Sequence, residues 1–146
     1  AAYCVDVPEE WADLDSLHQI LRRESNGLVG IPNYTIRLTS TGEPAKHTPE
    51  SWSRIHRILK RGYDALEREL FVEKDFIRTN STRRSYSSAS GLGQLLLRNV
   101  DKYYPLGKEG IGNPLAEAAG MLAYIDNRYG HPDVAWRMYS TLHEGY

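Results

Sequence analysis

The sequence has little of several features that would point to a particular class of protein. Cys4 is the only cysteine among 146 residues, which excludes an intrachain disulfide. An excess of one charge is missing too, because 18 Lys and Arg against 19 Asp and Glu leave a formal net charge of −1. Such a chain offers no general electrostatic surface for nucleic acid. No apolar run approaches the roughly 18 residues that span a bilayer. We therefore expect neither nucleic acid nor a membrane as a partner.

What remains is the composition of an ordinary globular domain. Hydrophobic residues make up 40% of the chain and charged residues 25%, so one core without disulfides is feasible and disorder is not expected. Residues 1–146 fit a single domain, and a start without methionine or signal peptide fits a domain excised from a longer chain. Tyrosine supplies 10 residues against 3 Trp and 2 Phe, which favours a wet, hydrogen-bonding cleft.

Apolar residues at spacings of three and four predict about five helices. The first begins at Pro8 and ends near Glu24, and a long one begins at Thr48-Pro49 and runs to Leu70. Three more follow: one between Ser90 and Pro105, one from Asn113-Pro114 to Gly130, and one from Pro132.

One extended region is expected beside these helices. Residues 34–38 alternate apolar and polar side chains before a turn at 40–44, which predicts a short strand. The polar stretch 71–90 is interpreted as a loop. The predicted fold class is therefore α+β and mainly α-helical.

Glu24 is the first candidate for chemistry. On the predicted helix it lies within about 20° of Leu17, beside the apolar stripe, so its carboxyl should be half-buried. Burial without a cationic partner favours the neutral acid, which can donate a proton near neutral pH. Arg22 and Arg23 adjoin it in sequence but should face solvent. The plainer alternative, a charged residue at a helix end, remains open from periodicity alone.

Two motifs resemble the lytic transglycosylase family, which has the goose-type lysozyme-like fold. The run Arg23-Glu24-Ser25-Asn26-Gly27 at the end of a first core helix resembles its catalytic Glu-Ser signature. The run Ser87-Ser88-Ala89-Ser90-Gly91-Leu92-Gly93-Gln94-Leu95 is similar to its second motif, in which a small-residue turn leads into Gly-Leu-x-Gln-Leu and a helix.

Two later segments extend the resemblance over most of residues 14–27 and 85–140. Asn113-Pro114 followed by 119–125 resembles the family helix with its Tyr-Ile pair, and 135–139 resembles the closing segment. The spacing of 32–34 and 103–105 to these motifs looks like the phage-associated branch. Departures are Ser140 and Glu117, where the family usually or often has Asn, and about seventy residues between Glu24 and Gln94, which imply an inserted helix.

The resemblance implies roles for particular residues. Glu24 would be the general acid and then the base, Gln94 would line the cleft floor, and Tyr139 would hold the glutamate. Tyr34 and Tyr124, within the matching segments, are further candidates for substrate binding. Backbone donors of Ser88 and Ala89 would bind a sugar acetamide, although a plain helix cap explains both residues equally well.

The resemblance also implies a reaction without metal or organic cofactor: cleavage of peptidoglycan between N-acetylmuramic acid and N-acetylglucosamine, leaving anhydro-muramyl ends. The expected partner is the glycan strand, in the bacterial wall or periplasm, and the phage-associated resemblance makes the chain a candidate part of a virion or tail assembly. A hydrolysing muramidase would need a second carboxylate, for which Glu43, Glu73 and Asp75 are candidates. The remaining alternative is a non-catalytic module that binds peptidoglycan or builds a virion. The five histidines show no metal-type spacing with each other or with Cys4.

Overall fold

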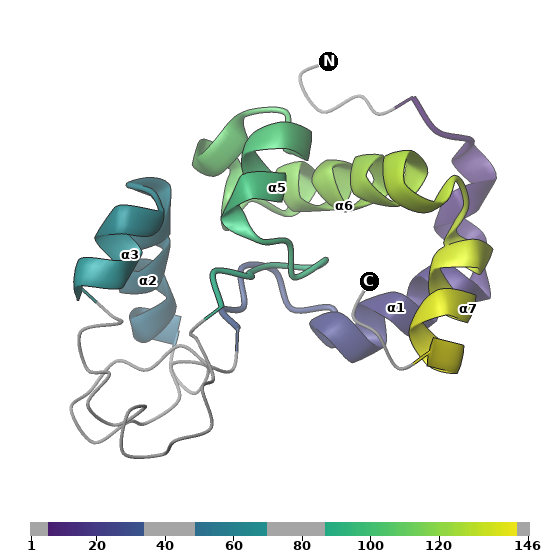
Figure 1. Ribbon diagram of the computed structural model, residues 1–146, viewed down its shortest axis with the longest axis horizontal. Helices are drawn as coiled ribbons and strands as arrows, with labels where there is room; N and C mark the ends of the chain where they lie inside the picture. The colour runs from purple at the N-terminus through teal and green to yellow at the C-terminus, as the bar shows by residue number, and fades with distance from the viewer. Residues whose placement is uncertain (1–5, 34–48, 70–86, 143–146) are drawn as a thin grey trace.

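The computed structural model describes residues 6–33, 49–69 and 87–142, which are coloured in Figure 1. In chain order the elements are η1 (Glu9–Asp13), α1 (Asp15–Glu24), α2 (Pro49–Lys60), α3 (Tyr63–Glu69), α5 (Leu97–Tyr103), η4 (Gly107–Gly110), α6 (Pro114–Tyr129) and α7 (Pro132–Leu142), where η marks a 3-10 helix. None of these helices is both long and apolar enough to cross a bilayer.

The predicted α+β class is wrong: the described part of the chain is all-α. Over its three ranges the chain forms helices and turns, and its extended residues meet only in isolated bridges, Pro32 with Ser90 and Ser90 with Leu95. A ladder does not grow from these bridges, because Gly91 and Gln94 have positive φ values of 78° and 51° and turn the chain back on itself. The predicted strand at 34–38 lies outside the described residues.

The two C-terminal helices begin where the sequence predicts. The side chain of Asn113 caps α6 by accepting a hydrogen bond from the N–H of Ala116 at 3.1 Å, and Pro114 occupies the first turn. Gly130 ends α6 in the left-handed conformation at φ 81°, and Pro132 then begins α7. Both predictions are confirmed.

The other three predicted helices are divided or begin later than their periodicity suggests. Leu14 is extended, with φ −72° and ψ 132°, so the expected first helix divides into η1 and α1. Gly62, at φ 103°, separates α2 from α3 within the predicted long helix. The turn around Gln94 delays the next helix, so that α5 begins only at Leu97.

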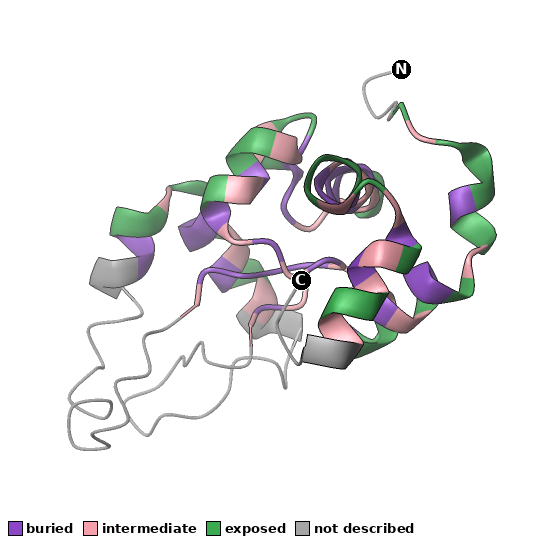
Figure 2. Cartoon of the chain, turned by 45° about the vertical axis from the view of Figure 1, so that its right-hand side comes forward, coloured by how far each residue is buried: buried purple, intermediate pink, exposed green. Residues whose placement is uncertain are grey.

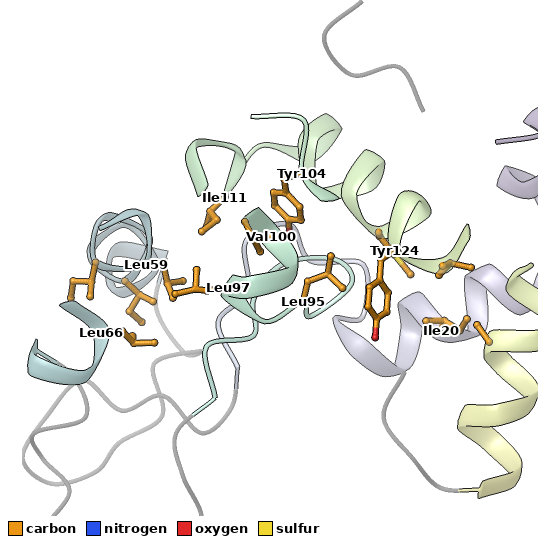
Figure 3. Close-up of a cluster of buried hydrophobic side chains, with 14 of the residues drawn as sticks. Ile20, Leu59, Leu66, Leu95, Leu97, Val100, Tyr104, Ile111 and Tyr124 are labelled. Atoms are coloured by element: carbon orange, nitrogen blue, oxygen red, sulfur yellow. The ribbon is translucent and has the colours of Figure 1, made fainter. Parts of the chain in front are cut away.

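The helices pack at two ends of a shared core. Helices α1 and α7 pack together at one end, α2 and α3 at the other, and α6 contacts both α5 and α7 (Figure 1). Two segments, 25–33 and 87–96, run between these groups, and Figure 2 shows that both carry buried residues. The hydrophobic core extends from α1 at one end to α2 and α3 at the other. Figure 3 labels nine of its side chains: Ile20, Tyr124, Leu95, Val100, Tyr104, Leu97, Ile111, Leu59 and Leu66.

A buried carboxylate ties these segments to the helices. Glu117 of α6 is fully buried, and its Oε1 accepts hydrogen bonds from the N–H of Gly30 at 2.9 Å and of Leu92 at 3.0 Å. Its Oε2 accepts a third from the N–H of Gly112 at 2.7 Å. Burial raises the pKa of Glu117, while the three N–H donors and the nearby His56 lower it. One side chain therefore fixes three separate backbone turns.

Glycine is required where the chain approaches this carboxylate. A Cβ on Gly91 would lie 2.5 Å from Oε1 of Glu117, and its φ of 78° disfavours any other residue. Gly30, one of the donors to Glu117, is also bound from the other side of the peptide chain: Nε2 of His56 in α2 donates a hydrogen bond to its carbonyl oxygen at 2.6 Å. The helix α2 is thereby joined to the turn that Glu117 holds.

Glu117→Gln should lower the free energy of unfolding by about 2–4 kcal/mol, because an amide offers one acceptor oxygen to three buried N–H donors that a carboxylate satisfies with two. Urea denaturation measures this change. The exposed Glu109→Gln serves as the control and should change stability by less than about 0.5 kcal/mol. Equal stability of the two variants would contradict the structural role of Glu117.

Candidate functional site

The first wall of the site is the C-terminal end of α1. Glu24 is the last residue of that helix, and the chain turns sharply after it through Asn26 at φ 54° and Gly27 at φ 74°. Ser25 holds the turn: its hydroxyl donates to the carbonyl oxygen of Leu21 at 3.2 Å and accepts from the N–H of Gly27 at 3.2 Å. The carboxyl of Glu24 is thus carried at a fixed, capped helix end.

Glu24 is half-buried, as its helical position predicts. Burial raises its pKa from the usual 4.5 to about 7, and two neighbours oppose this shift. The larger opposing effect is a hydrogen bond from the hydroxyl of Tyr139, and the smaller is the positive charge of Arg23. A carboxyl with a pKa near 7 exchanges its proton readily at neutral pH, as a general acid and base requires.

A stack of cationic and aromatic groups supports Tyr139. The rings of Trp136 and Tyr139 stack on α7, with centroids 5.9 Å apart and planes 29° apart. The guanidinium of Arg23 lies over both, 5.8 Å from the Trp136 centroid and 5.4 Å from that of Tyr139. Arg23 is exposed, as predicted, but it covers these rings instead of pointing freely into solvent. It therefore joins the end of α1 to α7 beside Glu24.

The second wall is the turn that contains Gln94. This residue is one of two described non-glycine residues with positive φ, at 51°, and its amide is fixed at both ends. Nε2 donates to the carbonyl oxygens of Ile31 at 2.9 Å and Gly91 at 3.1 Å, and Oε1 accepts from Nδ2 of Asn33 at 3.3 Å. A strained residue held this firmly is typical of a functional position.

Glu24 and Gln94 line the same cleft. Two adjoining pockets of about 310 and 290 Å³ share both residues. The larger extends from Glu24 across Asn33 and Ala89 to Tyr124 and Arg128, and the smaller extends along 22–26 and 31–32. Among the described residues that line these two pockets, Glu24 alone is a carboxylate.

The other predicted site residues fall into three groups. Tyr124 lines the larger pocket, and its hydroxyl accepts from Arg128 at 3.0 Å. Ala89 lines the same pocket, with its N–H bonded to Oγ of Ser87 at 3.1 Å. Ser88 lines neither of these two pockets, and its hydroxyl accepts from the N–H of Leu97 at 3.0 Å. Tyr34 and the possible second acids Glu43, Glu73 and Asp75 lie outside the described residues.

Three residues in or near the site have no role in the sequence predictions. Asn33 has no local signal, because its hydrogen bond goes to Gln94 in a distant segment. Arg128 lies one turn after Tyr124 on α6 and reaches the cleft through that residue's hydroxyl. Glu117 stood out only as a departure from the family pattern. Among the described residues, no three His, Cys, Asp or Glu side chains lie close enough to bind a metal ion.

Comparisons of the chain with protein-family models, with curated proteins and with solved structures give no match.

Glu24→Gln should stabilise the protein at pH 8 by on the order of 1–3 kcal/mol. The folded pKa of about 7 exceeds the usual 4.5, so the folded state binds the extra proton between these values and stability falls as pH rises through them. The advantage of the variant is complete above pH 7 and absent below about 4.5. Thermal unfolding at pH 4 and 8 measures it, and the exposed Glu10→Gln is the control. A less stable Glu24→Gln at pH 8 would contradict the electrostatics.

Arg23→Gln should raise the pKa of Glu24 further, because it removes a nearby positive charge and the cation that supports Tyr139. Titration of the carboxyl carbon of Glu24 by NMR measures this shift. Arg137→Gln removes an exposed charge from the same region of α7 and should leave the pKa unchanged. The interpretation fails if the two variants titrate alike.

Proposed function

We propose that this chain is a lytic transglycosylase that cleaves the glycan strand of peptidoglycan between N-acetylmuramic acid and N-acetylglucosamine. The single observation that carries the proposal is the position of Glu24, half-buried in a cleft with a pKa of about 7 and hydrogen-bonded to Tyr139. The motifs around Glu24 and Gln94 that resemble this family converge on that cleft.

In the proposed first step, Glu24 acts as the general acid. Its proton passes to the oxygen between the two sugars while the bond from that oxygen to the anomeric carbon of muramic acid breaks. The N-acetyl group of the same sugar stabilises the positive centre that remains. Burial keeps a large fraction of Glu24 protonated at neutral pH, so the proton is available when the substrate binds.

In the second step, Glu24 acts as the base. Its carboxylate takes the proton of a hydroxyl on the muramic acid, whose oxygen bonds to the anomeric carbon and closes the anhydro ring. The enzyme thereby regains its proton, and no water is consumed. The hydrogen bond from Tyr139 stabilises the carboxylate between the two steps and holds its orientation.

The described part of the cleft fits transglycosylation, which needs a single carboxyl group. Two-carboxylate glycosidases need a second acid within about 5–10 Å, as nucleophile or as base for water. The described residues of the two pockets supply only Glu24, with the amides of Gln94 and Asn33 opposite. These amides and the hydroxyl of the buried Tyr124 suit neutral acetamido sugars, which offer both hydrogen-bond donors and acceptors. The proposed substrate sets the place of action at the bacterial cell wall.

Purified peptidoglycan digested by the wild type should release muropeptides with anhydro-muramyl ends, identified by mass spectrometry. Glu24→Gln should release at least about 10²- to 10⁴-fold less, since one group serves as acid and base. Thermal unfolding checks that the Glu24→Gln variant is still folded, so that a loss of activity can be assigned to the missing carboxyl and not to unfolding.

Products heavier by one water would replace the proposal with a hydrolysing muramidase. No release by a folded wild type that still sediments with the wall would replace it with a binding module. In either case the assignment of a transglycosylase would be overturned.

A further inference from the structure

A third pocket, of about 570 Å³, continues from the cleft past the start of α5. It shares Ser87, Leu96 and Arg98 with the larger pocket of the Glu24 cleft, so the two pockets adjoin. Tyr63 of α3 and Lys108 of η4 complete its far side. Its volume lies in the range of about 300–1,000 Å³ that is usual for small-molecule sites.

The lining of this pocket is ionic, in contrast to the amide-lined cleft beside Glu24. Nζ of Lys108 lies 2.6 Å from Oδ1 of Asp101, and both side chains remain partly exposed. Arg98 lines both pockets and is exposed, and its guanidinium has no hydrogen-bond or ion-pair partner within the described part of the chain. Two cations against one carboxylate give the described lining a net positive charge.

The sugars of an intact glycan strand do not need such a lining, because the lactyl carboxyl of each muramic acid is bound to the stem as a neutral amide. The peptide stem on each muramic acid is different, since it carries free carboxylates. A muramic acid bound beside Glu24 would hold its stem within reach of the adjoining pocket. A guanidinium binds a carboxylate through two parallel hydrogen bonds, and an ammonium adds a point charge.

We propose that this pocket binds the peptide stem of the substrate, with Arg98 and Lys108 holding its carboxylates. This inference rests on the proposed function, and it makes the protein selective for strands that still carry their peptides. Arg98 is placed to contact the stem where it leaves the cleft, and Lys108 further along.

The test compares intact strands with strands whose stem carboxylates have been converted to carboxamides. Arg98→Gln and Lys108→Gln should each lower kcat/KM about three- to tenfold on intact strands and change it less than twofold on amidated strands. Arg98→Lys should recover part of the loss. Lys60→Gln, exposed at the end of α2, is the control and should behave as wild type on both. Equal effects on the two substrates, or none, would overturn the inference.

A binding measurement separates this inference from the proposed function. A muramyl peptide with free carboxylates should shift the NMR signals of Arg98 and Lys108 in the wild type, and its carboxamide form should not. Binding without cleavage of either substrate would overturn the transglycosylase and keep the stem site. Cleavage of both strands with no shift by the peptide would overturn the stem site alone.

Discussion

The arrangement depends above all on the buried carboxylate of Glu117. It accepts one backbone N–H from the turn after α1, one from the Gln94 turn and one from the turn before α6. Irregular segments inside a protein must satisfy their backbone groups somewhere, and here one side chain satisfies three. His56 adds α2 to the same group through the carbonyl oxygen of Gly30. A cleft made of turns thus gains the rigidity of the helices around it.

The site trades stability for chemistry. A carboxyl at a helix end normally stays ionised at neutral pH because water surrounds it, whereas burial raises the pKa of Glu24 to about 7. Tyr139 and Arg23 limit that shift, which keeps the carboxylate accessible as well as the acid. The strained backbone of Gln94 also lowers stability, and hydrogen bonds from its side chain to Ile31 and Gly91 hold it in place.

Local signals made the helix ends at Asn113 and Gly130 predictable, because caps act through neighbouring residues. The half-burial of Glu24 also followed from periodicity. The break at Gly62 did not, since a glycine fits an apolar stripe as well as a helix stop. The α+β expectation rested on the alternating pattern of 34–38, which lies outside the described residues, whereas the extended residues of the described part meet only in the bridges of Ser90 with Pro32 and with Leu95. Contacts between distant segments, such as those of Arg23 with α7, have no local signature at all.

The pH dependence of kcat/KM on isolated glycan strands tests the central claim most directly, because it joins the electrostatics of Glu24 to its proposed role. If the protonated Glu24 is the general acid, kcat/KM should fall above an apparent pKa of about 7. A rate that stays constant from pH 6 to 9 would mean that a different group, or none, donates the proton.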